Sequence, residues 1–459
     1  MISPYMNKGC LIPLFASFRI TAWPATLLAF IAMLAVGCND GSRSDVASSI
    51  PNASTDWTRD ILLTSLIVDL STMAVTADIV LAGSMDTTGA SFEIGDLMIM
   101  SVMSDGTPLD YLVEDQRLDV GVPVSVDPVV LMINYAYRLH DSFDGILSNG
   151  LTFTWPYYCG NMFPCKSDPY DGLSFELELI GIPVDMDVIY PTSILADAPP
   201  YMIGWAVGEF DYIDLGTTTD GTQVGVYYQP GEEIDATEGT RNLRDVMEWY
   251  EQTYGEYIFG EEVASVSVDW GAGQFGGLEH HPFWHVASGS MSDQSIHAHE
   301  AAHGWFGNGV RIACWEDFVL SEGVASYLAA RSLTEVGGVI LGNTIWTLYT
   351  SQLNRLQSSS ENKIAWPDSC NQVDIIDDGL FGSAPYMKGA FFLRDVESVI
   401  GKEMLDQALR DFYVTNKGGY AGMQDLLDEI MAHTGYDPTL CANAWLRSES
   451  LPVNGICDY

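Results

Sequence analysis

Basic side chains are scarce in this chain. Its 459 residues include 19 Lys and Arg against 62 Asp and Glu, which gives a formal net charge of −43 at pH 7. A surface this acidic repels phosphate backbones, so nucleic acid is excluded as an expected partner. We interpret the acidity as surface solvation, and a surface that recruits cationic ligands is the alternative.

The apolar run near the N-terminus is too short for a comfortable membrane span. Lys8 and Arg19 precede "ATLLAFIAML", which ends in "AVGC" at Ala35 to Cys38. This order of charged, apolar and small residues is typical of an export signal. The segment "AVGC" resembles a bacterial lipobox, in which Cys38 becomes the lipidated first residue of the mature protein. The alternative is an ordinary signal peptide that is cleaved elsewhere. We therefore expect an exported lipoprotein of the cell envelope, anchored to the membrane on the outer-membrane or periplasmic side.

Cysteines in the CxxC spacing are also missing. None of the eight cysteines forms a CxxC pair, which argues against a cysteine metal cluster. Apart from Cys10 and Cys38, six cysteines remain, and an even number in an exported protein suggests disulfides. The pairing stays open, although two pairs are close in sequence: Cys159 with Cys165, and Cys441 with Cys457.

The two halves of the chain have different hydrophobic periods. Stretches such as "LIVDLSTMAVTADIVLAG" and "LSFELELIGIPVDMDVIY" are rich in β-branched residues and often alternate, which predicts strands. After "QPGEEIDATEGT" apolar residues recur every three or four positions, which predicts helices, one of them ending at Gly255. The expected class is α+β, an antiparallel β-sandwich-like domain followed by a mainly helical domain. The expected boundaries are 1–37 for the signal peptide, 38–57 for a flexible tether, 58–235 for the β domain and 236–459 for the helical domain.

The segment "SIHAHEAAHGWFGN" predicts a metal site. His299 and His303 are four positions apart, so both imidazoles project from one face of a helix and can bind one zinc ion. Glu300 lies between them, placed to act on water rather than on the metal. His297 points to another side of this helix, and we expect it at the surface or behind the ligands rather than on the metal.

A third ligand is predicted at Glu322, where the next helical pattern, "SEGVASYLAAR", begins. Two antiparallel helices could present His299, His303 and Glu322 to one zinc ion and leave a fourth position for water. That open position distinguishes a catalytic zinc site from a structural one.

These residues resemble the membrane alanyl aminopeptidase family, the gluzincin zinc aminopeptidases of peptidase family M1. The resemblance rests on "HEAAHGWFGN" and "WEDFVLSEGVASYLAAR" and implies a thermolysin-like zinc peptidase fold for the helical domain. "GGLEH" resembles the family's Gly-Ala-Met-Glu-Asn motif, which implies that Gly276, Gly277 and Glu279 bind substrate, with Glu279 on the free α-ammonium group. "PYMKGAFFL" resembles the family's Tyr-Glu-Lys-Gly segment, which implies that Tyr386 stabilises the oxyanion.

The sequence departs from the family's pattern in three ways. Ser321 replaces the asparagine of Asn-Glu-Gly, and "LTFTWPYYCGNM" before Phe163 lacks the glutamine or glutamate that gives a second amine anchor. We also expect a form without the large helical C-terminal domain that most members carry. The cleft should therefore be more open, or be covered by a partner.

The expected function is a zinc-dependent aminopeptidase that uses one Zn²⁺ to hydrolyse N-terminal residues from peptides with a free N-terminus. Glu300 and Tyr386 are the expected catalytic residues. One alternative is an endopeptidase or another zinc hydrolase on the same scaffold. The other is a non-catalytic binding lipoprotein in which zinc only connects helices.

Overall fold

The computed structural model describes residues 52–141, 144–154, 158–271, 276–370, 381–453 and 455–458. All of them fall within one compact unit, residues 49–459. The expected signal peptide, Cys38 and most of the expected tether lie outside the described residues. Within the described part of the chain, no helix is both long and apolar enough to cross a membrane.

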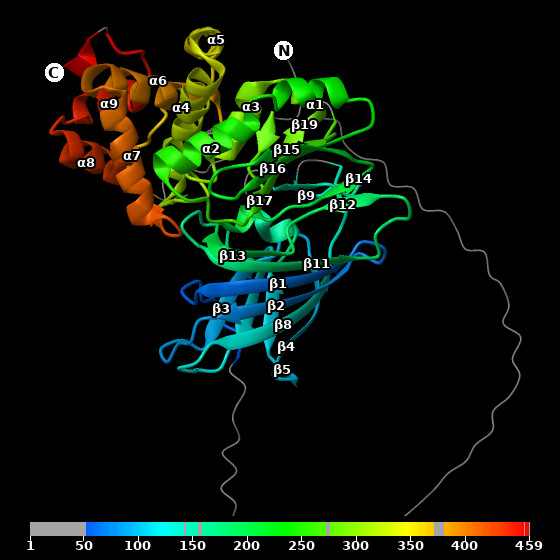
Figure 1. Ribbon diagram of the computed structural model, residues 1–459. Helices are drawn as coiled ribbons and strands as arrows, with labels where there is room; N and C mark the ends of the chain where they lie inside the picture. The colour runs from blue at the N-terminus through cyan, green and yellow to red at the C-terminus, as the bar shows by residue number, and fades with distance from the viewer. Residues whose placement is uncertain are drawn as a thin grey trace, which may run out of the picture. The chain divides into compact units, whose positions relative to one another are not determined.

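The first half is built on a seven-stranded sheet, whose central strands lie side by side in Figure 1. In spatial order its strands are β13 (Ser193–Ala198), β11 (Leu173–Ile180), β1 (Ile61–Asp69), β2 (Ala74–Leu81), β8 (Val129–Ala136), β4 (Met98–Ser104) and β5 (Thr107–Pro108). Burial alternates residue by residue along β2, as the sequence pattern predicts for a strand with one face in the core. The pair β1–β11 is parallel, while the other pairs of this sheet are antiparallel.

Smaller sheets complete the first half. They are the three-stranded sheet of β3 (Gly89–Glu93), β7 (Arg117–Gly121) and β6 (Tyr111–Glu114), and the pairs β9 (Asp144–Ile146) with β10 (Thr152–Thr154) and β12 (Asp187–Ile189) with β14 (Ala206–Gly208). Phe92 and Leu118 of the three-stranded sheet are fully buried in the same hydrophobic core as the large sheet. The two sheets therefore share one core, as in a sandwich.

A mixed sheet connects the two halves. Its order is β15 (Asp211–Thr217), β16 (Gln223–Tyr228), β17 (Glu262–Val268), β19 (Phe283–Ala287) and β18 (Gly277–Leu278). β16 pairs in parallel with β17, so backbone hydrogen bonding continues across residue 235, where the composition changes. The boundaries 58–235 and 236–459 stay a prediction from composition.

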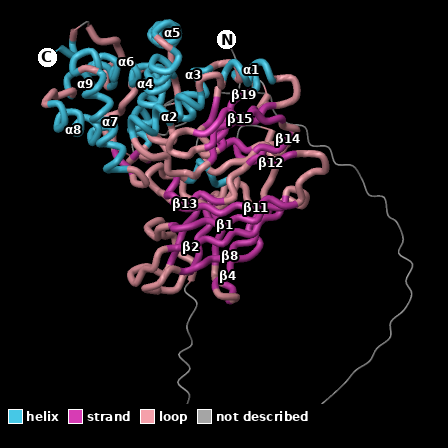
Figure 2. The backbone as a smooth tube through the Cα atoms, in the orientation of Figure 1, coloured by secondary structure: helices cyan, strands magenta, loops and turns pink. Residues whose placement is uncertain are grey.

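The second half is mainly helical, and Figure 2 shows its helices gathered beside the mixed sheet. The helices are α1 (Glu233–Gly239), α2 (Leu243–Tyr254), α3 (Gln294–Ala302), α4 (Phe318–Gly337), α5 (Val339–Ser358), α6 (Ser383–Ile400), α7 (Lys402–Asn416), α8 (Met423–Thr434) and α9 (Thr439–Leu446). Two short strands of this half, β20 (Arg311–Ile312) and β21 (Tyr420–Ala421), pair with each other in parallel. The predicted α+β class, with a β-rich first half and a helical second half, is confirmed.

Five short 3₁₀ turns lie in the loops among the described residues: Cys159–Asn161, Pro200–Met202, Ser288–Ser290, Trp315–Asp317 and Ile456–Asp458. All six cysteines outside the N-terminal segment form disulfides, which pair Cys159 with Cys165, Cys314 with Cys370 and Cys441 with Cys457. The prediction of disulfides is therefore confirmed.

Arg311 fastens the β-rich half to the helical half. Its buried guanidinium donates hydrogen bonds to three backbone carbonyl oxygens, those of Tyr170 at 3.2 Å, Asp197 at 3.0 Å and Gly418 at 3.2 Å. Tyr170 and Asp197 belong to the first half, whereas Gly418 precedes β21 in the second. One side chain thus satisfies carbonyl groups from both halves at their contact.

Candidate metal and catalytic site

Helix α3 carries the first part of the site. The side chain of Asp293 caps its N-terminus by accepting a hydrogen bond from the backbone N–H of Ser295 at 2.9 Å. The helix ends at Ala302, and His303 is its C-terminal cap with helical backbone angles. His299 and His303 therefore keep the one-turn spacing that places both rings on the same side.

The turn that follows α3 contains Gly307. Its φ of +108° belongs to glycine, and a Cβ there would lie 2.7 Å from Nδ1 of His303. This turn brings the carbonyl oxygen of Phe306 to 3.0 Å from the same Nδ1. Nδ1–H then donates to the carbonyl, which leaves Nε2 with a lone pair for a metal.

Helix α4 supplies Glu322 opposite the two histidines. Its Oε2 lies 3.0 Å from Nε2 of His299 and 3.5 Å from Nε2 of His303, and the two Nε2 atoms are 3.2 Å apart. Ligand atoms at about 2.1 Å from a tetrahedral zinc ion lie roughly 3.4 Å from one another. The three predicted ligand atoms therefore converge at the spacing that a zinc ion requires.

The electrostatics of this cluster also fit a cation. Glu279, Glu300 and Glu322 are all at most 5% exposed and lie close to His303. Burial lowers the pKa of the His303 imidazole, but the nearby carboxylates, that of Glu322 foremost, raise it to about 10. A divalent ion between these groups would offset the excess of buried negative charge.

Glu300 lies between the histidines on α3, with its carboxylate against strand β18. A Cβ built at Gly277 would be 2.4 Å from Oε1 of Glu300, so only glycine leaves room for the carboxylate. Burial, then the charges of Glu279 and Glu322, raises the pKa of Glu300 well above its ordinary value, although His303 opposes this shift.

The segment after β18 brings Glu279 to the same place. Ligand atoms of Glu279, Glu300 and His303 lie within 4.8 Å of one another. Asn308 donates a hydrogen bond to the carbonyl oxygen of Glu279 at 2.8 Å, and His281 hydrogen-bonds the carbonyl oxygen of Glu300 at 2.8 Å. These contacts connect the β18 segment to α3 and to the turn that follows it.

Tyr386, in the first turn of α6, faces the cluster from the other side. Its ring stacks on that of His299 at 5.9 Å between centroids and meets the edge of Phe318 at 6.1 Å. Its hydroxyl donates a hydrogen bond to the carboxylate of Glu322, and burial and the surrounding carboxylates raise its pKa well above the ordinary value. Tyr386 therefore lies next to the predicted metal ligands.

All eight predicted site residues in the described part of the chain line one cavity of about 790 Å³. They are Gly276, Gly277, Glu279, His299, Glu300, His303, Glu322 and Tyr386. The rest of the wall was not predicted from the sequence, and it includes Phe153, Phe381 and residues of α5 such as Tyr349 and Arg355. No motif marks these residues, although Tyr349, Gln352 and Leu356 have the helical spacing of one face.

His297 lies away from this cavity, as predicted, but it is buried rather than at the surface. Its Nδ1 is 2.8 Å from Oγ of Ser265 on β17, and its Nε2 is 2.8 Å from the carbonyl oxygen of Met291. Both ring nitrogens thus have partners within the protein, and His297 attaches α3 to the mixed sheet.

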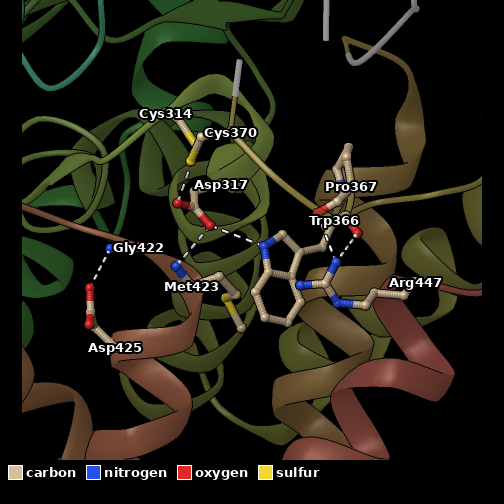
Figure 3. Close-up of a disulfide and its surroundings, with 9 residues drawn as sticks. All are labelled: Cys314, Asp317, Trp366, Pro367, Cys370, Gly422, Met423, Asp425 and Arg447. Atoms are coloured by element: carbon tan, nitrogen blue, oxygen red, sulfur yellow. Dashed lines mark hydrogen bonds between the residues drawn. A yellow bond between two sulfur atoms is a disulfide. The ribbon is translucent and has the colours of Figure 1, made fainter. Parts of the chain in front are cut away.

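The start of α4 is held by the disulfide Cys314–Cys370 and by Asp317 (Figure 3). Asp317 accepts hydrogen bonds from Nε1 of Trp366 and the backbone N–H of Met423, each at 3.0 Å. The guanidinium of Arg447 covers the Trp366 ring at 3.6 Å from its centroid. This framework fixes the helix from which Glu322 projects.

Comparison with known proteins agrees with this geometry. Residues 284–445, which include the histidines, Glu322 and Tyr386, match the model of the peptidase family M1 domain. These residues are similar to a peptidase family M1 domain. The predicted resemblance to this family is thereby confirmed.

Curated M1 relatives are aminopeptidases of greater length. Aminopeptidase M1-D of Oryza sativa subsp. japonica is 26% identical over 325 residues, which cover 64% of this chain and 36% of the relative. Aminopeptidase N of Lactobacillus helveticus is 24% identical over 406 residues, which cover 78% of this chain and 47% of the relative. The chain therefore spans about a third to a half of the length of these relatives.

Solved M1 structures share the fold. An M1 zinc metallopeptidase variant from Deinococcus radiodurans, bound to a Tyr-Ser-Ala substrate, has a TM-score of 0.72 at 18% identity, covering 86% of this chain and 95% of that chain. Yeast LTA4 hydrolase in complex with bestatin has a TM-score of 0.73 at 19% identity, and the match covers 90% of this chain and 72% of the yeast chain. At such identities these comparisons establish the fold alone.

Proposed function

We propose that this protein is a zinc aminopeptidase that removes N-terminal residues from peptides. The proposal rests mainly on the convergence of His299, His303 and Glu322 within 3.5 Å of one another, in the same cavity as Glu300. The aminopeptidase names of the curated relatives support the same activity. One zinc ion would be held by these three residues.

Zinc, when bound, supplies Lewis-acid polarisation of the scissile carbonyl and lowers the pKa of a water molecule toward about 7. Glu300 accepts a proton from the attacking water and returns it to the amine that leaves as the peptide C–N bond breaks. The close approach of Gly277 confines the Glu300 carboxylate to the position from which it serves both transfers.

Tyr386 and Glu279 act on the two sides of the reacting carbonyl. The Tyr386 hydroxyl, which donates to Glu322 in this structure, turns its hydrogen bond to the oxygen on which charge develops. Glu279 binds the free α-ammonium group by a charge-assisted hydrogen bond and so sets the distance from the chain end to the cleaved bond. The backbone of Gly276 and Gly277 lies beside the first residue of the substrate.

A matched pair of peptides tests the exopeptidase assignment. The wild-type protein should release the first residue from a free-amine peptide and leave its N-acetylated counterpart intact, because Glu279 requires an ammonium partner. Glu300→Gln should retain one zinc per chain while turnover falls by about 10²- to 10⁴-fold. Equal cleavage of both peptides would instead identify an endopeptidase, and zinc binding without any turnover would identify a binding protein.

We also propose, from the N-terminal sequence, that the chain is exported and lipidated at Cys38. Expression of the full chain in bacteria with a radiolabelled fatty acid tests this assignment. Label should enter the wild-type protein and be absent from Cys38→Ser, which should leave the membrane fraction. Label that persists in Cys38→Ser would contradict it.

A further inference from the structure

The cavity has a second wall, formed by one face of α5, that the proposed reaction does not use. Tyr349, Gln352 and Leu356 line it at spacings of three and four residues, and Arg355 lines it beside Leu356. The first turn of α3 faces this wall, because Ser295 and Ile296 line the same cavity and the charge of Asp293 acts on Tyr349. The α5 wall thus lies next to the turn that precedes His299.

Arg355 is the single Lys or Arg among the described residues that line the cavity. Its side chain is exposed, and its guanidinium donates to the hydroxyl of Ser351 at 3.3 Å, while no carboxylate of the described chain lies within ion-pair distance. Among the described residues, most of its five N–H donors have no acceptor. This is unusual in a chain with 62 acidic residues.

Two carboxylates line the cavity near this wall, and both have other hydrogen bonds. Asp293 accepts from the backbone and the hydroxyl of Ser295, at 2.9 and 2.6 Å. Glu361 accepts from the backbone N–H of Ser383 at 3.2 Å. The cavity consequently has a carboxylate-rich part at Glu279 and Glu300 and a cationic part at Arg355.

We propose that Arg355 binds a carboxylate of the substrate on the leaving-group side of the cleaved bond, so that short peptides with a free C-terminus are preferred. The inference rests on the proposed aminopeptidase function, in which Glu279 holds the opposite end of the peptide. A planar guanidinium binds a carboxylate through two parallel hydrogen bonds, which a neutral amide terminus cannot accept equally well. A cavity of about 790 Å³ is of the size that encloses small ligands, so a peptide of a few residues fits between the two charges.

Kinetics on three matched tripeptides test the site. The first has a free C-terminal carboxylate, the second a C-terminal amide, and the third an amide terminus with glutamate as its last residue. Wild-type kcat/KM should be about tenfold higher for the free acid than for the amide, mainly through KM, as one charge-assisted contact implies. Arg355→Gln should reduce the free acid to the level of the amide, and Arg355→Lys should retain part of the preference.

Arg138→Gln is the matched control. Arg138 is also exposed and has the same charge, but it follows β8 and does not line the cavity. Its substitution should leave the preference unchanged. Faster cleavage of the glutamate peptide than of the plain amide by the wild type, but not by Arg355→Gln, supports the same site. In that case a side chain of the substrate supplies the bound carboxylate. Equal cleavage of acid and amide by the wild type, or a preference that survives Arg355→Gln, overturns the inference.

A binding measurement separates this inference from the proposed function. Calorimetry with the Glu300→Gln protein should show the free-acid tripeptide binding about tenfold more tightly than its amide, and Glu300→Gln with Arg355→Gln should remove the difference. If the wild type cleaves none of the peptides but this difference is found, the aminopeptidase proposal fails and the carboxylate site stands. Equal binding of acid and amide overturns the site whatever the turnover.

Discussion

Alanine at Gly277 should impair catalysis without unfolding the protein. The added Cβ would lie 2.4 Å from Oε1, 2.6 Å from Cδ and 2.7 Å from Cγ of Glu300, and an ordinary contact needs at least 3.4 Å. The carboxylate must therefore move by about 1 Å, a displacement that can cost about 10²-fold in rate. Because the contacted atoms belong to the end of a flexible side chain, the cost in folding free energy should be small.

Steady-state kinetics and zinc analysis of Gly277→Ala measure this effect. We expect kcat to fall by about 10²-fold while zinc stays at one equivalent per chain, since His299, His303 and Glu322 are untouched. Gly289→Ala is the control, because a Cβ at Gly289 meets no atom within 4 Å. Wild-type kcat in Gly277→Ala would refute the role assigned to the confined Glu300 carboxylate.

Three further predictions concern stability. Replacing both Cys314 and Cys370 by serine should lower the free energy of unfolding by about 4 kcal/mol, because the disulfide closes a loop with a sequence separation of 56; an unchanged urea midpoint would contradict this. Arg311→Ala should lower the free energy of unfolding by about 3 kcal/mol, because three backbone carbonyl oxygens lose their buried donor. A loss below about 1 kcal/mol would show that water replaces the guanidinium. Burial, partly offset by Lys166, raises the pKa of Asp171 from 3.8 to about 7, so its stabilising contribution is present at pH 4 and is lost as the pH rises through 7. Asp171→Asn should flatten this part of the stability profile, and an unaltered profile would exclude Asp171 as its source.

Local sequence patterns predicted the three metal ligands, whereas Glu279 and Tyr386 were predicted from the family resemblance. The spacing of His299 and His303 fixes their common direction. Glu322 was predicted at the start of the helical pattern "SEGVASYLAAR", whereas α4 begins earlier, at Phe318. Their convergence in one cavity was predictable for this reason. The catalytic and binding roles of these residues remain predictions that the experiments above test.

Other features depend on contacts between distant segments and left no local signal. The parallel pairing of β1 with β11 brings together strands separated by nine others in the chain, and β16 leaves the first half to pair with β17. The turn at Gly307 that follows α3 is another such feature, because no apolar period reveals it. Arg355 likewise reads as an ordinary helical residue until α5 is placed beside α3.

Titration of the metal-free protein with zinc tests the central claim most directly. Release of the first residue is followed with a free-amine peptide and with its N-acetylated counterpart as zinc is added in steps. Turnover of the free-amine peptide should rise linearly and stop rising at one equivalent of zinc per chain, and no turnover of the acetylated peptide should develop. Turnover without zinc, a rise that continues to two equivalents, or equal cleavage of the acetylated peptide would contradict the claim.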